Sequence, residues 1–164
     1  MEKDERAPMP SMIFRDASAA DLPALIALLD DDDLSRGRED SSLPLDARYL
    51  AAFAAVESDP NQRLIVAEQD GTIVGTMQLS FLPGIAFRGA WRGQIEAVRI
   101  AAPVRGAGLG SQMIEWAVER CRERGCRMVQ LISMQTRTGA HRFYERLGWS
   151  KSHYGFKRAI EQKD

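Results

Sequence analysis

The sequence predicts an α/β protein in which helices flank a central mixed, mostly antiparallel sheet, in the chain order β-α-α-β-β-β-α-β-α-β. Three observations lead to this prediction. Two runs of strand-forming residues flank an Asp-Gly pair, which is typical of a tight hairpin. Two amphipathic stripes with helical spacing each end at a glycine. Short apolar runs with strand composition lie before, between and after these stripes.

Length and charge narrow the class of protein further. The 164 residues predict one domain, residues 12–164, after a flexible polar leader at residues 1–11. A net charge of −1 gives no electrostatic footprint for nucleic acid. Two cysteines and two histidines argue against a disulfide framework and against a metal site. With no signal peptide or membrane-spanning run recognised, we expect a cytoplasmic protein without membrane or nucleic-acid partners.

The chain begins with a short strand and two helices. Residues 12–14 are apolar and predict the strand, and Asp21 is placed to cap a helix over residues 22–29. The acidic run at residues 30–33 predicts a solvated loop or helix end; the alternative is an acidic lip that attracts a cationic acceptor. A second helix is expected over residues 45–57. Its apolar face would hold Tyr49, Leu50, Phe53 and Val56.

The middle of the chain predicts three strands. Residues 63–68 and 72–79 form a hairpin around Asp70-Gly71, because that pair suits the positive φ angles of a type I′ turn. Residues 94–100 predict the third strand.

The remaining elements alternate between helix and strand. Residues 109–121 predict an amphipathic helix that stops at Gly125, and residues 127–134 predict a buried strand. A last helical stripe ends at Gly148, and residues 149–160 predict a final, partly polar strand. The stripe consists of Ala140, Phe143, Tyr144 and Leu147.

The glycine-rich segment between a strand and a helix carries most of the functional information. It reads Arg105-Gly106-Ala107-Gly108-Leu109-Gly110. Glycines let the backbone approach a ligand closely, and free N–H groups at a helix start favour a negative charge, so we expect a phosphate-bearing ligand. A P-loop would need a lysine before Ser111, and a dinucleotide fold would place its glycine turn after the first strand.

Three separated motifs resemble those of GNAT N-acetyltransferases. The glycine-rich segment resembles the Arg/Gln-x-x-Gly-x-Gly/Ala pyrophosphate loop of that family, and residues 96–103 resemble the strand and connector that lead into it. Residues 140–149 are similar to the Ala-x-x-Phe-Tyr-x-x-x-Gly-Phe signature near the family's C-terminus. The start of the chain, at residues 15–17, is similar to the family's opening. The resemblance implies a GNAT-like fold and transfer of an acetyl group from acetyl-CoA, with no metal.

The resemblance also implies which residues bind coenzyme A. Loop amides would take the pyrophosphate, a strand edge would pair with the pantetheine arm, and the last helix would contribute two side chains. These residues are Arg105, Gly106, Ala107, Gly108, Leu109, Gly110 and Ser111 for the loop, Ala97, Val98 and Ile100 for the strand, and Ala140 and Phe143 for the helix.

Two residues are candidates for acid–base chemistry. Tyr144 matches the family tyrosine that often protonates the leaving thiolate, and its hydroxyl is protonated at neutral pH; the alternative is a core residue. Glu96 is the candidate general base, directly or through a water, and it would share a strand face with Gln94 and Val98 if no bulge intervenes. A surface glutamate, or one in a salt bridge with Arg88, Arg92 or Arg99, is equally consistent with the sequence, and solvent could also deprotonate the amine.

Other polar residues near the last helix have smaller roles. His141 is expected on the outer side of that helix, where a surface or coenzyme-phosphate contact is favoured over catalysis. The family often has Asn where this chain has Arg137, which leaves open how the thioester end is held.

The acceptor is open at this point. We expect a primary amine of a small molecule or peptide, and the alternative is a non-catalytic acyl-CoA-binding module of the same fold. Residues 30–48 and 80–92 are expected to wall the acceptor site. The aromatic residues Phe81, Phe87 and Trp91 would form an apolar wall, part of the core or a contact in a homodimer.

Overall fold

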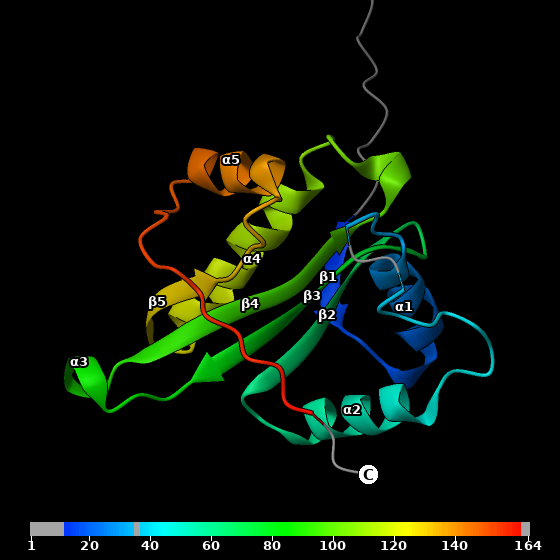
Figure 1. Ribbon diagram of the computed structural model, residues 1–164, viewed down its shortest axis with the longest axis horizontal. Coiled ribbons are helices and arrows are strands. Elements are labelled where there is room, and N and C mark those ends of the chain that lie inside the picture. Colours follow the sequence, from blue (N-terminus) through cyan, green and yellow to red (C-terminus); the bar gives the residue numbers. More distant parts are fainter. Residues whose placement is uncertain (1–11, 35–36, 162–164) are drawn as a thin grey trace, which may run out of the picture. The chain divides into compact units, whose positions relative to one another are not determined.

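The computed structural model describes residues 12–34 and 37–161, so the expected leader at residues 1–11 lies outside the described residues. The chain divides into two compact units, residues 1–130 and 131–164, and each is considered by itself. Figure 1 shows the order of the elements along the chain. Their bounds are β1 Met12–Asp16, a 3-10 turn Ala19–Asp21, α1 Leu22–Asp30, α2 Ala47–Ser58, β2 Gln62–Gln69, β3 Thr72–Leu82, α3 Ala86–Gly89, β4 Trp91–Ile100, a 3-10 turn Ala102–Val104, α4 Leu109–Glu123, β5 Cys126–Leu131 and α5 Thr138–Arg146.

A five-stranded sheet in the order β1-β2-β3-β4-β5 organises the first unit. The first four strands pair antiparallel with their neighbours. β4 and β5 are joined through α4, the kind of crossover that parallel neighbours need, so the sheet is mixed as the sequence predicts. The predicted turn between β2 and β3 is confirmed, because Asp70 and Gly71 have φ angles of 50° and 77°.

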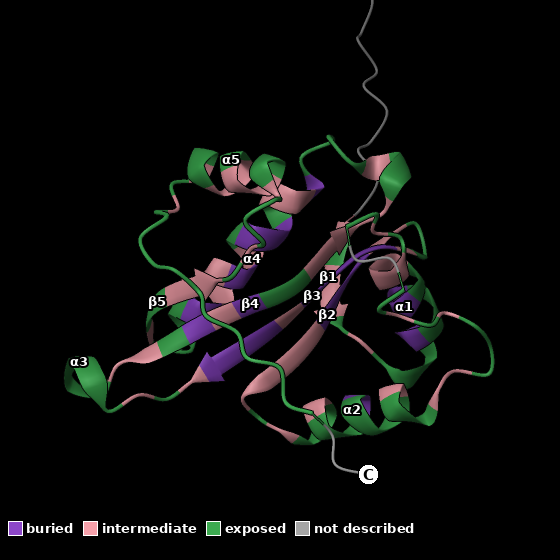
Figure 2. Ribbon diagram, in the orientation of Figure 1, coloured by how far each residue is buried: buried purple, intermediate pink, exposed green. Residues whose placement is uncertain are grey.

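One face of the sheet packs against α4. Gly75 on β3 points toward Met113, and Gly93 on β4 points toward Cys121. A Cβ atom built on Gly93 would lie 2.2 Å from the Cys121 Sγ, so this position has no room for a side chain. Met113 and Cys121 are almost fully buried. Figure 2 shows buried residues along α4 and along β3 and β4. Odd-numbered residues of β3 and β4 therefore point toward α4, which we call the α4 face of the sheet. On β4 this alternation holds as far as the β-bulge at Ala97 that is described below.

The opposite face packs against α1 and α2. Leu22, Ile26 and Phe53 form a buried cluster, and Leu64 of β2 packs against it. Leu64 pairs with Gln78, and Gln78 pairs with Glu96, so these three side chains belong to the α1/α2 face. Of the apolar face predicted for the second helix, Phe53 is buried, whereas Leu50 is 49% exposed.

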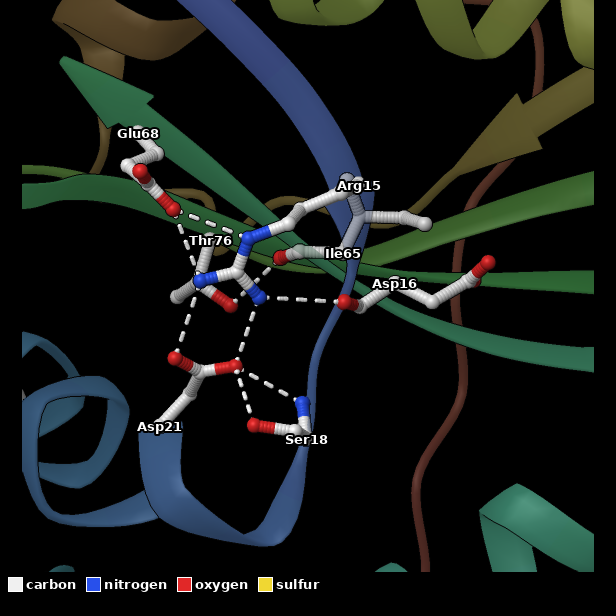
Figure 3. A network of polar contacts seen from close by, with 7 residues as sticks. All are labelled: Arg15, Asp16, Ser18, Asp21, Ile65, Glu68 and Thr76. Atoms are coloured by element: carbon white, nitrogen blue, oxygen red, sulfur yellow. Dashed lines mark hydrogen bonds and ion pairs between the residues drawn. The ribbon is translucent and has the colours of Figure 1, made fainter. Parts of the chain in front are cut away.

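A network of charged groups fixes the start of α1 to the sheet (Figure 3). The Arg15 guanidinium donates from Nη1 and Nη2 to the two Asp21 carboxylate oxygens, at 2.7 and 3.0 Å, and from Nε to Glu68 at 2.9 Å. Ser18 donates its N–H and its hydroxyl to the same Asp21 carboxylate. Asp21 therefore stands at the start of α1 as expected, but its side chain binds Arg15 and Ser18 and does not cap α1. The Arg15 hydrogen bonds hold the pKa of Asp21 well below its ordinary value.

Two strand predictions near the C-terminus need correction. The strand expected over residues 127–134 ends at Leu131, and none of its residues is buried. The reason is its place in the sheet: β5 is an outer strand, and an apolar run does not tell an edge strand from a central one.

The final strand expected over residues 149–160 is absent from the described residues of the second unit. Residues 150–161 are exposed and have no regular secondary structure. A strand forms only where its backbone groups pair with a neighbour, and alternating side chains carry no information about that partner. The fold class itself is confirmed, and the predicted helix with its apolar stripe is α5, followed by Gly148 with φ 83°.

Candidate active site

A β-bulge interrupts β4 at Ala97. Thr76 pairs with Arg99 and Gln78 pairs with Glu96, so the two residues Ala97 and Val98 lie opposite the single residue Met77. Ala97 has φ 53°, in the left-handed region, which costs an L-residue about 1–2 kcal/mol. A strained, non-glycine bulge persists only where the surrounding structure holds it, and such positions concentrate at functional sites.

The bulge exposes backbone groups that a regular strand would pair. In the register between β3 and β4, Ala97 and Val98 are not paired with any residue of β3. The Val98 carbonyl accepts a hydrogen bond from Arg99 Nη1 at 2.8 Å, and the Ile100 carbonyl accepts one from Arg105 Nε at 2.8 Å. The bulge also ends the simple alternation of faces, so the expected shared face of Gln94, Glu96 and Val98 is kept only as far as Glu96.

The glycine-rich loop leads directly into the N-terminus of α4. Gly106 and Gly108 have φ angles of 83° and 85°, and neither has an atom near the place of a Cβ. Gly108 is the N-cap of α4 and no side chain caps the helix, whose first turn carries no acidic residue. The first backbone N–H groups of α4 therefore face outward beside an exposed loop, which favours an anionic group. Leu109 is buried and anchors this turn.

The acidic run forms the end of α1 and a loop in which Asp31 and Asp33 are exposed, as expected, but two of its carboxylates contact arginines near the bulge and the glycine-rich turn. Asp32 forms an ion pair with Arg99 at 2.8 Å, and its side chain is only 10% exposed. Asp31 lies 3.4 Å from Arg105. These contacts attach the loop after α1 to the end of β4 and to the glycine-rich turn, a connection across more than sixty residues of sequence that composition does not indicate.

Glu96 lies on the α1/α2 face of β4, one residue before the bulge. Its side chain is exposed. Within the described residues it has no hydrogen bond or ion pair, so the salt bridge weighed from the sequence is not seen there, while the alternative of a surface glutamate agrees with its exposure. An unpaired carboxylate beside strained backbone suits a group that must accept a proton from a substrate.

The second unit holds the other candidate residues. On α5 the Tyr144 ring lies 5.0 Å from the Phe143 ring and 5.9 Å from the Trp149 ring, measured between ring centroids. Ala140 and Phe143 are half-buried. His141 Nε2 donates to the Met134 carbonyl at 2.9 Å, so this ring holds the loop before α5. The roles of Tyr144, Ala140 and Phe143 stay predictions.

The matching family model decides the class of this chain. Residues 24–149 match the model of the acetyltransferase (GNAT) family, which is more than three-quarters of the sequence.

The chain belongs to the GNAT family.

Its relatives agree with this assignment. It is 34% identical to the aminoalkylphosphonate N-acetyltransferase of Salmonella typhimurium over 112 residues, which are 68% of this chain and 72% of the relative. A solved structure described as a transcriptional regulator from Bacillus halodurans is 42% identical, with a TM-score of 0.89 over 92% of this chain and 100% of the other. A Trypanosoma brucei acetyltransferase is 28% identical, with a TM-score of 0.74 over 92% and 100%. This GNAT chain is an acetyl-CoA-dependent N-acetyltransferase.

The expected aromatic wall of this GNAT protein does not form as one surface. Phe81 and Trp91 lie on the α4 face, where the Arg124 guanidinium sits 5.6 and 5.4 Å from their ring centroids. Phe87 is 69% exposed in the turn between β3 and β4. Side chains alternate between the two faces along a strand, so Trp91 and Glu96, five residues apart on β4, point to opposite faces. Phe81 belongs with Trp91, because it pairs with Gly93 on the same face.

Sequence reasoning missed a row of polar side chains on the face that carries Glu96. Gln62, Gln78 and Ser80 are joined by hydrogen bonds, and Gln130 donates to Gln94 at 2.8 Å. The available signal was an excess of polar residues at alternate positions of strands that helices were expected to cover.

Among residues 12–34 and 37–161, no helix combines the length and the apolar character needed to cross a bilayer.

Proposed function

We propose that this GNAT protein transfers the acetyl group of acetyl-CoA to the primary amine of a small molecule, by direct attack within a ternary complex. The observation that carries the proposal is the strained bulge at Ala97, with Glu96 before it on the same strand and the glycine-rich start of α4 after it. One strand thus connects a candidate base, unpaired backbone and an anion-binding turn.

Coenzyme binding is assigned to residues whose chemistry fits it. The outward N–H groups at Gly108, Leu109 and Gly110 would hold the pyrophosphate, with Arg105 and Ser111 beside them. The backbone of Ala97 and Val98 would pair with the pantetheine amides. Ala140 and Phe143 on α5 are proposed as coenzyme contacts from the family resemblance alone. Bound there, acetyl-CoA supplies an activated thioester carbonyl.

Glu96 and Tyr144 are given complementary roles. Glu96 removes a proton from the acceptor ammonium, directly or through a water, so that the amine lone pair can form the new C–N bond. Tyr144 donates its hydroxyl proton to the thiolate as the C–S bond breaks. The nitrogen loses a second proton as the amide forms, and this proton returns to the Tyr144 oxygen, so the products are an amide, free coenzyme A and the one proton held by Glu96.

The acceptor proposed first is a short aminoalkyl compound. This choice is supported by the name of the Salmonella relative, an aminoalkylphosphonate N-acetyltransferase, which is 34% identical to this chain. We also propose that the protein is cytoplasmic, because acetyl-CoA and a small primary amine would both be available there.

The test is release of free thiol from acetyl-CoA, measured with a panel of small primary amines and without amine. Thiol release that depends on the amine, with formation of the acetylated product by mass spectrometry, is the expected result. If acetyl-CoA binds but no amine increases thiol release, the alternative of a non-catalytic acyl-CoA-binding module replaces this proposal.

A further inference from the structure

The α1/α2 face of the sheet carries a row of uncharged polar side chains that ends in two opposite charges. Register places Gln62 opposite Ser80 and Ser80 opposite Gln94, so the row crosses three strands. Directly opposite residues share a face of the sheet. On β4 the same face also presents Arg92 and Glu96, on either side of Gln94.

Hydrogen bonding within the row leaves donors available to a ligand. The Gln62 Oε1 atom accepts from both Gln78 Nε2, at 3.1 Å, and Ser80 Oγ, at 2.7 Å. The Gln94 Oε1 atom accepts from Gln130 Nε2 at 2.8 Å. Each of these two glutamines uses its carbonyl oxygen inside the row and keeps its NH2 group for another acceptor. The neighbours also fix the two side chains, so these donors are held in place before a ligand arrives.

Arg92 differs from most arginines on the sheet. Arg15, Arg63 and Arg99 each form an ion pair with a carboxylate. Arg92 is exposed and has no hydrogen bond or ion pair within the part of the chain that the structure describes. It pairs with Leu82 across the ladder, which offers no polar group from its side chain. Arg127 on β5 is also exposed, but it lies two residues from Val129, which faces Gly93 on the α4 face.

We propose that the acceptor is a short zwitterion, whose anionic group binds Arg92 and the Gln94 NH2 while its ammonium group lies at Glu96. The two charged residues are four positions apart on one strand, about 13 Å between Cα atoms. Both side chains extend from the same face, so a molecule a few bonds long reaches from one charge to the other across Gln94. A guanidinium is suited to phosphonate or carboxylate oxygens because its planar donors match two of them at once.

This inference rests on the proposed function and names the acceptor's second group. It assigns Arg92 and Gln94 to specificity and leaves proton transfer to Glu96. An amine of the same length without an anionic group would still reach Glu96. It would leave the Arg92 charge and the Gln94 donors without a partner on the ligand.

The experiment compares three acceptors of similar length: 2-aminoethylphosphonate, β-alanine and ethanolamine. We expect kcat/KM to be higher for 2-aminoethylphosphonate and β-alanine, which carry an anionic group, than for ethanolamine, which has a hydroxyl in its place. In R92Q the ratio of kcat/KM for 2-aminoethylphosphonate over ethanolamine falls about tenfold, mainly through KM, since one charge-assisted contact is lost. R92K, which keeps the charge without the planar donors, gives an intermediate ratio.

R127Q is the matched control, because it removes the same charge from the other face of the sheet and should keep the wild-type ratio. Equal ratios in wild type and R92Q, or an equal fall in R127Q, would overturn the inference while leaving acetyl transfer intact. If no amine at all releases thiol, it is the proposed function that fails. The preference between phosphonate and carboxylate then tells which anionic group the site takes.

Discussion

The two faces of β4 have opposite characters although they alternate along the same ten residues. On the α4 face, Gly93 and Ile95 are buried, and Gly93 touches Cys121 so closely that no side chain fits. On the α1/α2 face, Arg92 and Glu96 are exposed and Gln94 is half-buried. One face therefore fixes the position of the strand, and the other presents groups that still need partners. The comparison indicates that the packed face fixes the strand, which would preorganise the polar face and the bulge for the binding and reaction that we propose there.

The largest expected effect is on the packed face. G93A places a Cβ 2.2 Å from the Cys121 Sγ, so the strand or α4 must move, and we expect a loss of about 3 kcal/mol in the free energy of unfolding. Urea denaturation followed by circular dichroism measures this loss. G75A is the matched control: its Cβ would meet the flexible end of Met113 at 2.9 Å, so its cost should be clearly smaller. Equal costs would show that the two contacts are equally soft.

The next effect concerns the polar face. E96Q removes the candidate base but keeps the size of the side chain, so we expect kcat to fall about a hundredfold, or about 2.7 kcal/mol, with little change in stability. The dependence of kcat/KM on pH should lose its acidic limb if Glu96 itself accepts the proton. An unchanged pH profile and unchanged kcat would exclude Glu96 and leave solvent as the base.

A third prediction concerns a charged group that, unlike Arg92 and Glu96 on β4, has partners within the described part of the protein. Arg15 and Ser18 hold the pKa of Asp21 below its ordinary value of 3.8, so this carboxylate stabilises the native state above that pH. The stabilisation is lost as pH falls through the lower folded pKa, because the proton then abolishes the ion pair. D21N should cost about 2 kcal/mol at pH 7 and much less near pH 2. Denaturation at the two pH values measures the difference, and the same cost at both would contradict the ionic explanation.

The smallest effect is expected at the bulge. A97G removes the left-handed strain of Ala97 but adds chain entropy to the unfolded state, so stability should rise by no more than about 1 kcal/mol. A97V, whose β-branched side chain tolerates that conformation least, should lower stability instead. Thermal melting of the two variants decides the matter: a lower melting temperature for A97G than for A97V would mean that the bulge is not strained.

The parts of this fold that could be predicted from sequence are those marked by local chemistry. Asp70-Gly71, Gly108, Gly125 and Gly148 each adopt the positive φ that their position suggested. The bulge could not be predicted, because alanine carries no preference for a left-handed conformation and tertiary packing sets it. The ion pair of Asp32 with Arg99 joins distant segments, so the acidic run gave no sign of its partner. Among the proposed site residues, Glu96 and the glycine-rich loop were predicted from their place in a motif and stay predictions, whereas the glutamine row needed the register of the sheet.

The most direct test of the central claim is the thermal stability of the protein with acetyl-CoA, and with ATP and NAD as controls. That claim is that the bulge of β4 and the start of α4 hold acetyl-CoA. A ligand at 100 times its dissociation constant adds about 2.7 kcal/mol to the native state and raises the melting temperature by about 5–11 °C for a chain of this size. We predict a rise with acetyl-CoA alone. No rise at millimolar acetyl-CoA, or equal rises with all three ligands, would contradict the account.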